Sequence, residues 1–348
     1  AGTPLAEIVT EPDIRSPAEA KIFLQELRLM MRYLDVSDAD MEKGHLRCDA
    51  NISLRPRGEV LLSPKTEIKN LNSFRSVERA LTYEIGRQAE LWDAGTPDAL
   101  QTTRGWDETK GETVLQRTKE EASDYRYFPE PDIPPLHLTS EYVRNITAHM
   151  PELPEQRRLR FAEQYILTKK DIDILVNDKD LGDFFEKAAS ELQAWLDAEK
   201  RSWATEGPAL MTQLANWLIN RLQKLIAENK QTLSESNITP ENFAEFVKIV
   251  ASGSVNNQGA QKILTLMSET GHDPSDILER EGLGQMQDAE KLVEIVQRVI
   301  DANPKVVGDV RAGKEQAKKF LVGKVMAATK GTANPQMVAA LLDEKLSA

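Results

Sequence analysis

The sequence predicts an α+β protein, in which helices and a mainly antiparallel sheet are followed by a second part that is almost wholly helical. Residues 46–55 alternate strictly between apolar and polar side chains, as a strand with one buried face does. Beyond residue 150 helical periodicity dominates, and six prolines between Pro129 and Pro154 interrupt regular structure at the junction. Because 348 residues are too many for one small core, we expect three domains, over residues 1–149, 150–280 and 281–348.

The first predicted element is a helix that starts after Ser16. Ser16 and Glu19 form a capping box, and Pro17 between them suits the first helical position. Six apolar residues then recur at helical spacing and predict a buried stripe: Phe23, Leu24, Leu27, Met30, Met31 and Leu34.

The strand over residues 46–55 comes next, and four further elements complete the first part. They are a strand at Lys65–Leu71, a helix that Ser73 can cap, and strands at Gln101–Asp107 and Glu112–Arg117. In the second part, apolar spacing or a capping pair marks the helices that contain Trp195, Leu214–Leu222, Thr239-Pro240 and Lys291–Ala302.

The composition excludes several classes of protein. The single cysteine, Cys48, rules out an internal disulfide and a thiolate zinc cluster, and is typical of a reducing compartment such as the cytoplasm. The four histidines lack the spacing of a metal-binding pair. No apolar stretch approaches the roughly 20 residues of a membrane span. A net charge of −12 argues against a protein that simply coats nucleic acid.

Several familiar motifs are also absent from the sequence. It contains no GxxxxGK[ST] phosphate loop, no GxGxxG turn and no G-x-S-x-G elbow, which disfavours a P-loop NTPase, a Rossmann dehydrogenase and an α/β-hydrolase. The start has no initiator methionine, basic leader or apolar signal core, so we expect further residues upstream of Ala1.

The polar face of the 46–55 strand is the first candidate site. Arg47, Asp49 and Asn51 could share this face with Glu67 and Lys69 of the next strand. Carboxylates suit Mg²⁺ and neighbouring cations suit phosphoryl oxygens, so the face could hold a magnesium nucleotide. The alternative is a solvated sheet face with a ladder of arginine and aspartate, and the spacing alone does not decide between them.

A second candidate region is dense in arginine, acidic and aromatic side chains. It comprises residues 103–108 with Arg104, then Arg117, then residues 124–129 with Arg126. Such a mixture could bind phosphate, adenine or the end of a tRNA. Alternatively, the aromatic residues of the last segment anchor an irregular stretch to the core.

The third candidate lies in the tail, where residues 305–330 carry seven cationic and two acidic side chains. A charge run on a helix is usually a solvated face, but the contrast with the acidic remainder makes contact with a phosphate backbone equally reasonable. The candidate contacts are Arg311, Lys314, Lys318, Lys319, Lys324 and Lys330.

Several of these residues lie in motifs that resemble the GatB family. The motifs occur in order along the full chain: Gly2-Thr3-Pro4-Leu5, Leu46-Arg47-Cys48-Asp49-Ala50-Asn51, Glu67-Ile68-Lys69-Asn70-Leu71-Asn72-Ser73, Asp124-Tyr125-Arg126-Tyr127-Phe128-Pro129, Phe320-Leu321-Val322-Gly323 and Thr332-Ala333-Asn334-Pro335-Gln336. GatB is one of the subunits of aspartyl/glutamyl-tRNA amidotransferase, so the sequence is similar to a component of protein synthesis.

The resemblance implies a fold and a reaction. The fold would be the C-terminal part of a cradle domain that resembles the glutamine synthetase catalytic fold, then an all-α domain and a small YqeY-like helical tail. The enzyme would use ATP and Mg²⁺ to phosphorylate the side-chain carboxylate of Glu on tRNA(Gln) or Asp on tRNA(Asn), and ammonia would displace the phosphate. The GatA subunit would release that ammonia from glutamine, GatC would help to hold the subunits together, and a non-discriminating aminoacyl-tRNA synthetase could supply the substrate.

The match to the family motifs assigns roles to individual residues. The metal-binding carboxylates would be Asp49 and Glu67. The residues that neutralise phosphoryl charge would be Arg47, Lys69 and Arg104, and those that contact the nucleotide would be Asn51, Arg117 and Arg126. The basic tail would hold tRNA away from its acceptor end. Family members begin upstream of Gly2, so a histidine and a glutamate from upstream residues would complete the metal site.

Two other functions are compatible with the sequence. A non-catalytic tRNA-binding module would explain the basic tail, and a scaffold fragment that docks GatA would need neither ATP nor Mg²⁺. The catalytic subunit is favoured because transfer of a phosphoryl group to a carboxylate requires acids for Mg²⁺ and bases for phosphate, and both occur together in this chain.

Overall fold

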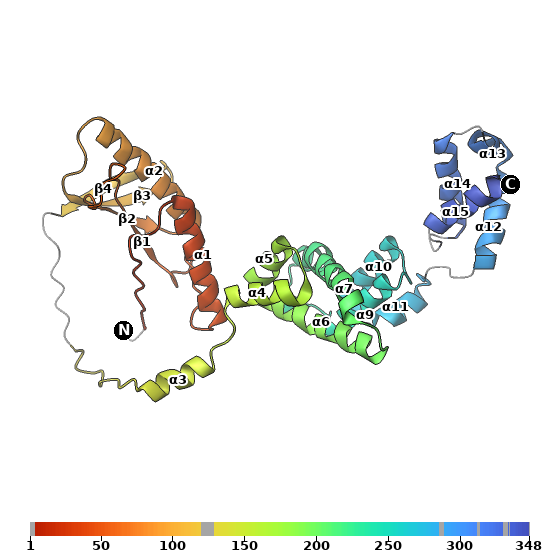
Figure 1. Ribbon diagram of the computed structural model, residues 1–348, viewed down its shortest axis with the longest axis horizontal. Helices are drawn as coiled ribbons and strands as arrows, with labels where there is room; N and C mark the ends of the chain where they lie inside the picture. Colours follow the sequence, from red (N-terminus) through yellow and green to blue (C-terminus); the bar gives the residue numbers. More distant parts are fainter. Residues whose placement is uncertain are drawn as a thin grey trace. The chain divides into compact units, whose positions relative to one another are not determined.

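The computed structural model describes residues 4–119, 129–284, 289–311, 314–329, 333 and 335–347. The chain forms two compact units, residues 1–156 and 157–348 (Figure 1). The division lies close to the boundary predicted at residue 149. The first unit combines helices with a four-stranded sheet, whereas the described part of the second unit is built from helices.

The first unit contains every helix and strand that the sequence predicted for it, and one more helix. In chain order its elements are α1 (Pro17–Tyr33), β1 (Cys48–Ile52), β2 (Thr66–Leu71), α2 (Phe74–Asp93), β3 (Gln101–Asp107), β4 (Glu112–Lys119) and α3 (Ser140–Ala148). The predicted caps are present, since the Ser16 hydroxyl accepts a hydrogen bond from the backbone N–H of Glu19 and the Ser73 hydroxyl accepts one from that of Ser76. The regular part of β1 is shorter than the predicted range 46–55.

The four strands form one mixed sheet in the order β1-β2-β3-β4. The outer pairs, β1–β2 and β3–β4, are antiparallel, but the central pair β2–β3 is parallel. The predicted antiparallel sheet is therefore correct for the outer pairs and wrong for the central one. The physical reason is the connection: α2 runs between β2 and β3, and a helical crossover returns the chain in its original direction.

A β-bulge in β2 separates two functions of that strand. Cys48 is paired with Leu71 and Ala50 with Ile68, so β2 carries one extra residue here. Asn70 accommodates it in the left-handed conformation, with φ of 64°, and its side-chain amide donates a hydrogen bond to the Trp106 carbonyl at 2.9 Å. The bulge returns Leu71 to the buried face of the sheet, because without the extra residue it would share the face of Lys69.

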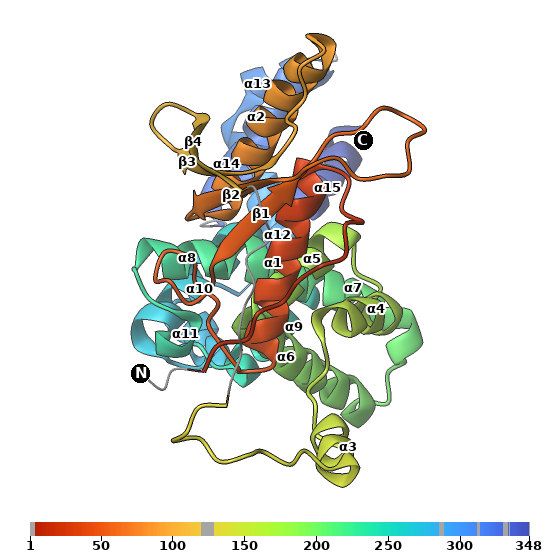
Figure 2. The same ribbon diagram turned by 90° about the vertical axis from the view of Figure 1, so that its left-hand side faces the viewer.

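The two long helices of the first unit, α1 and α2, pack together and cover one face of the sheet (Figure 2). A cluster of buried side chains joins the helices to that face: Leu24, Ile68, Leu71, Val77, Ala80, Leu81 and Trp106. The polar residues of β1 and β2 alternate with residues of this cluster, so they lie on the other face. The fold therefore leaves a polar sheet face that α1 and α2 do not cover.

The helices of the second unit include all those that the sequence predicted. They are α4 (Pro154–Tyr165), α5 (Lys169–Asn177), α6 (Lys179–Ala198), α7 (Trp203–Trp217), a π-helical turn (Leu218–Leu222), α8 (Gln223–Glu228), a 3₁₀ turn (Leu233–Glu235), α9 (Pro240–Ala251), α10 (Asn257–Thr270), α11 (Pro274–Arg280), α12 (Ala289–Ala302), α13 (Pro304–Arg311), α14 (Glu315–Ala328) and α15 (Pro335–Ser347). Within the described ranges, no helix is both long and apolar enough to cross a membrane.

The last four helices, α12 to α15, surround a hydrophobic cluster of their own. Its buried members are Leu292, Val296, Leu321, Val325, Ala333, Val338 and Leu342. A private core is what a separate tail domain requires. The boundary expected at residue 281 stays a prediction, because residues 157–348 form one unit by their contacts.

Candidate active site

Four polar residues form a row across the uncovered face of the sheet, one from each strand. Asn51 of β1 is paired with Glu67 of β2, Glu67 with Thr103 of β3, and Thr103 with Arg117 of β4. Directly paired residues project to the same side of a sheet, with their β-carbons about 5 Å apart. The structure thus brings together three residues expected in the site, Asn51, Glu67 and Arg117, and adds Thr103.

Lys69 connects this row to Asp49, the next polar residue of β1. Its ammonium nitrogen lies 2.6 Å from Asp49 Oδ2 and 3.4 Å from Glu67 Oε1. The hydrogen bond to Asp49 raises the pKa of the Lys69 ammonium above its ordinary value, and the charge of Glu67 adds to the effect, while partial burial opposes it. Lys69 therefore stays charged at neutral pH and neutralises both carboxylates.

The carboxylate of Glu67 has a second partner on the other side. The Thr103 hydroxyl donates a hydrogen bond to Glu67 Oε2 at 2.8 Å, and Arg117 Nε lies 3.4 Å from the same hydroxyl oxygen. The Glu67 side chain is 19% exposed, compared with 49% for Asp49, so the two carboxylates lie at different depths of one open surface.

The residues on this face fit a magnesium nucleotide better than a metal enclosed by protein. Among the described residues, no group of three or more histidine, cysteine, aspartate or glutamate side chains could hold a metal ion. Mg²⁺, however, usually keeps several waters and takes one or two carboxylates together with phosphate oxygens. Asp49 and Glu67 supply such a pair, and Lys69 and Arg117 supply cations for phosphate.

Two of the expected site residues are placed less fully. Arg47 is exposed and directly precedes β1, two residues from Asp49. Arg126 lies outside the described residues, together with the aromatic residues around it.

Arg104 does not join the other expected residues, which corrects its predicted position. It follows Thr103 in β3 and so points to the opposite face, beneath α2. There its guanidinium donates to the hydroxyl of Thr113 at 2.7 Å and lies 3.7 Å from the carboxylate of Glu84. The Glu84 side chain is fully buried, with 0% exposed, and it neutralises the charge that we expected Arg104 to offer to a phosphoryl group.

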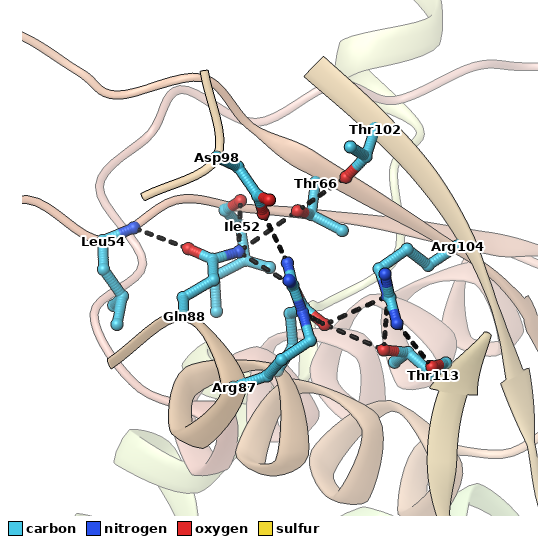
Figure 3. A network of polar contacts seen from close by, with 10 residues as sticks. Ile52, Leu54, Thr66, Arg87, Gln88, Asp98, Thr102, Arg104 and Thr113 are labelled. Carbon is cyan, nitrogen blue, oxygen red and sulfur yellow. Dashed lines mark hydrogen bonds and ion pairs between the residues drawn. The ribbon is translucent and has the colours of Figure 1, made fainter. Parts of the chain in front are cut away.

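A network of buried polar side chains on α2 ties this helix to the sheet (Figure 3). Gln88 accepts a hydrogen bond from the backbone N–H of Leu54 at 2.9 Å, and it donates to the Thr66 hydroxyl at 3.2 Å. One turn earlier, Glu84 accepts from Arg87 at 2.6 Å. The network secures the end of β1 just beyond Asn51, so it supports the geometry of the open face from behind.

The sequence analysis missed this network, although a signal for it was present. Glu84 and Gln88 continue the helical spacing of the buried residues Val77 and Leu81. Acidic and amide side chains on a buried stripe predict a polar network, because such groups are buried only when they have partners.

In the tail, the structure divides the expected cations into paired and unpaired groups. Lys314 contacts Asp309 at 2.8 Å, and Lys318 contacts Asp343 at 2.6 Å. Lys319 and Lys324 are exposed on α14, and Lys324 lies over the ring of Phe320, 5.4 Å from its centre. Arg311 ends α13, while its side chain and all of Lys330 lie outside the described residues.

Comparison with known proteins gives matches over both units. Residues 1–144 match the family described as GatB/GatE catalytic domain, and residues 203–346 match the family described as GatB domain. The open sheet face lies wholly within the first match, and the cations of α14 lie within the second.

Individual relatives match almost the whole chain. A protein of Persephonella marina is 44% identical over 346 residues, which is 99% of this chain and 70% of the relative. A protein of Roseiflexus sp. is 43% identical over 349 residues, covering 100% of this chain and 69% of the relative. One from Thermotoga petrophila is 42% identical over 345 residues, covering 99% and 68%. All three are named as the GatB-type subunit of an aspartyl/glutamyl-tRNA(Asn/Gln) amidotransferase.

Proposed function

The chain belongs to the GatB family, and on this premise we propose that it is the subunit of a tRNA-dependent amidotransferase that activates a carboxylate for amide formation. The relatives' name supplies the substrates, Glu on tRNA(Gln) and Asp on tRNA(Asn). The observation that carries the proposal is the pair of carboxylates, Asp49 and Glu67, on either side of Lys69 on a sheet face that α1 and α2 leave open.

The reaction needs activation because the side-chain carboxylate of Glu or Asp is a poor acyl donor. Direct attack by ammonia would have to expel an oxide ion. ATP, held as its magnesium complex, supplies a phosphoryl group to one carboxylate oxygen. Attack of the ammonia nitrogen on the carbonyl carbon then breaks the bond to that oxygen, which leaves as part of inorganic phosphate, and loss of a proton from nitrogen yields the amide.

The open face provides what this chemistry asks of a protein. Phosphoryl transfer depends mainly on positioning and on neutralisation of negative charge. Asp49 and Glu67 would hold Mg²⁺ through oxygen, and Lys69 and Arg117 would bind phosphoryl oxygens. Asn51, paired with Glu67, would offer its amide to the nucleotide or to the substrate carboxylate.

We also propose partners for this chain. A glutaminase subunit, GatA, would provide ammonia, and GatC would help to hold the assembly together; the relatives are named as one subunit of their enzyme, which supports an assembly of several different chains. The exposed lysines of α14 would contact tRNA, which a synthetase could deliver in misacylated form. The tRNA substrates named for the relatives make the cytoplasm the expected place of action.

The test is ATP-dependent amidation of misacylated tRNA by the reconstituted complex. We expect Glu67→Gln and Asp49→Asn to abolish amide formation, because each removes a carboxylate that would hold Mg²⁺, while glutamine hydrolysis stays measurable. Glu90→Gln, at an exposed carboxylate of α2, is the matched control and should amidate like the wild type. Normal amidation by Glu67→Gln would refute the proposed site, and amidation that needs no ATP would refute the proposed reaction.

A further inference from the structure

We propose that Thr103 is a positioning residue, which fixes the carboxylate of Glu67 for metal binding through a hydrogen bond whose direction Arg117 imposes. The inference rests on the proposed function, because it concerns the same site. It adds a residue that has no charge, touches neither substrate nor metal, and was not among the residues predicted from the sequence.

The direction of the hydrogen bond follows from the chemistry of three groups. The Thr103 hydroxyl oxygen lies 2.8 Å from Glu67 Oε2 and 3.4 Å from Arg117 Nε. A guanidinium can only donate hydrogen bonds, and a hydroxyl has a single proton. The hydroxyl therefore accepts from Arg117 and gives its proton to Glu67. The row Arg117, Thr103, Glu67 is a chain of donors that ends on the carboxylate.

The surroundings of Thr103 keep this hydroxyl in place. The residue is 1% exposed, so bulk water does not compete for its hydroxyl. Threonine is branched at the β-carbon and has restricted rotation about its first side-chain bond. Strands β2 and β3 pair Glu67 directly with Thr103, so the backbone holds donor and acceptor at a constant separation.

Fixing one oxygen of Glu67 orients the other. Because Oε2 is turned toward Thr103, Oε1 faces the Lys69 ammonium at 3.4 Å, and Asp49 Oδ2 contacts the same ammonium at 2.6 Å. The two carboxylates thus present one oxygen each to a position that already holds a cationic group. Without the Thr103 hydroxyl, the Glu67 carboxylate could rotate away from this position, and a metal ion would lose one of its two protein ligands.

The neighbouring residue Thr102 is a matched control. It belongs to the same strand, is 7% exposed, and its hydroxyl also makes a hydrogen bond, to the hydroxyl of Thr66 at 3.0 Å. That contact lies on the face covered by α2, where Gln88 joins it. Thr102→Val therefore removes the same group from the same strand without touching Glu67.

The experiment compares Thr103→Val, Thr103→Ser and Thr102→Val in the assembled enzyme. Binding is measured without turnover, as the Mg²⁺ concentration that gives the half-maximal rise in melting temperature with a non-hydrolysable ATP analogue. We expect Thr103→Val to raise this concentration by about tenfold or more, the range that loss of an outer hydrogen bond to a metal ligand costs. Thr103→Ser, which keeps the hydroxyl, should rescue the wild-type value, and Thr102→Val should not change it.

Glu67→Gln, measured in the same way, separates the two levels of the proposal. If Glu67→Gln loses the Mg²⁺ response while Thr103→Val behaves like Thr102→Val, the role of Thr103 is overturned and the metal site stands. If Glu67→Gln responds to Mg²⁺ like the wild type, the metal site itself is overturned. Should Thr103→Val melt before the assay begins, Thr103→Cys replaces it. A weaker Mg²⁺ response than that of Thr103→Ser supports the inference, and an equal one overturns it.

Discussion

The ammonium nitrogen of Lys69 lies 2.6 Å from Oδ2 of Asp49, across the β1–β2 pair. The same nitrogen is within 3.4 Å of Glu67, so one tethered cation serves both carboxylates. It occupies the position where two oxygen ligands converge. Mg²⁺ must therefore displace Lys69 before it can bind, and the released ammonium becomes available to a phosphoryl group.

Replacement of Lys69 by methionine should tighten the binding of Mg²⁺ in the absence of nucleotide. Each ion pair at this partly exposed surface is worth up to about 1 kcal/mol, so loss of the competing cation should improve affinity roughly two- to fivefold. Amidation should nevertheless fall, because the phosphoryl group loses a counter-charge. Calorimetric titration with Mg²⁺ measures the first effect. Lys21→Met, which breaks a lysine–glutamate pair between α1 and α2, is the control; Mg²⁺ binding that is unchanged in Lys69→Met would contradict the displacement.

Glu84→Gln should strongly destabilise the first unit. This buried carboxylate contacts Arg87, Arg104 and Thr113, and its loss leaves buried guanidinium groups without a counter-charge. Removal of one partner from a buried charged network costs about 3–5 kcal/mol. Hydrogen exchange of the β3 amides reports the opening of this unit separately from the helical one. Glu78→Gln on the same helix, in a partly exposed pair with Lys21, should cost less than about 1 kcal/mol, and an equal cost for both variants would speak against the network.

Two adjacent lysines of α14 should differ in their contribution to tRNA binding. Lys319 is exposed, whereas Lys318 is held 2.6 Å from Asp343. A cation that contacts phosphate releases counterions, so Lys319→Gln should reduce the slope of log affinity against log salt by about 0.7–0.9. Lys318→Gln should reduce it less, because Asp343 already neutralises that lysine. Filter binding at several salt concentrations gives both slopes, and equal slopes for the two variants would argue against this division.

The single cysteine provides a test that depends on pH. Burial, with a smaller contribution from the charge of Asp49, raises the pKa of the Cys48 thiol to about 11. The folded state therefore disfavours the thiolate. The resulting stability is complete below the ordinary thiol pKa near 9 and is lost as pH rises toward 11. At pH 8, alkylation by iodoacetamide should be about a hundredfold slower in the native than in the denatured chain. Equal rates would mean that the thiol is open to solvent, and Cys48→Ser gives the background.

Local patterns in the sequence predicted most helices and strands. Capping residues such as Ser16, Ser73 and Thr239 act on their own helices, and the alternation in β1 acts on its own strand. The parallel pairing of β2 with β3 and the bulge at Asn70 were not predicted, because both depend on contacts between segments far apart in the chain.

The sequence by itself determined which residues can carry the chemistry, and it placed Asp49 and Glu67 on polar strand faces, because side chains in a strand alternate with a period of two. The tertiary structure decided which of the other residues join them. Pairing of β2 with β3 puts Thr103 beside Glu67, and the next residue, Arg104, must then point beneath α2. No local pattern contains this register, because it is set by the combined packing of α2, β2, β3 and β4 around the buried carboxylate of Glu84.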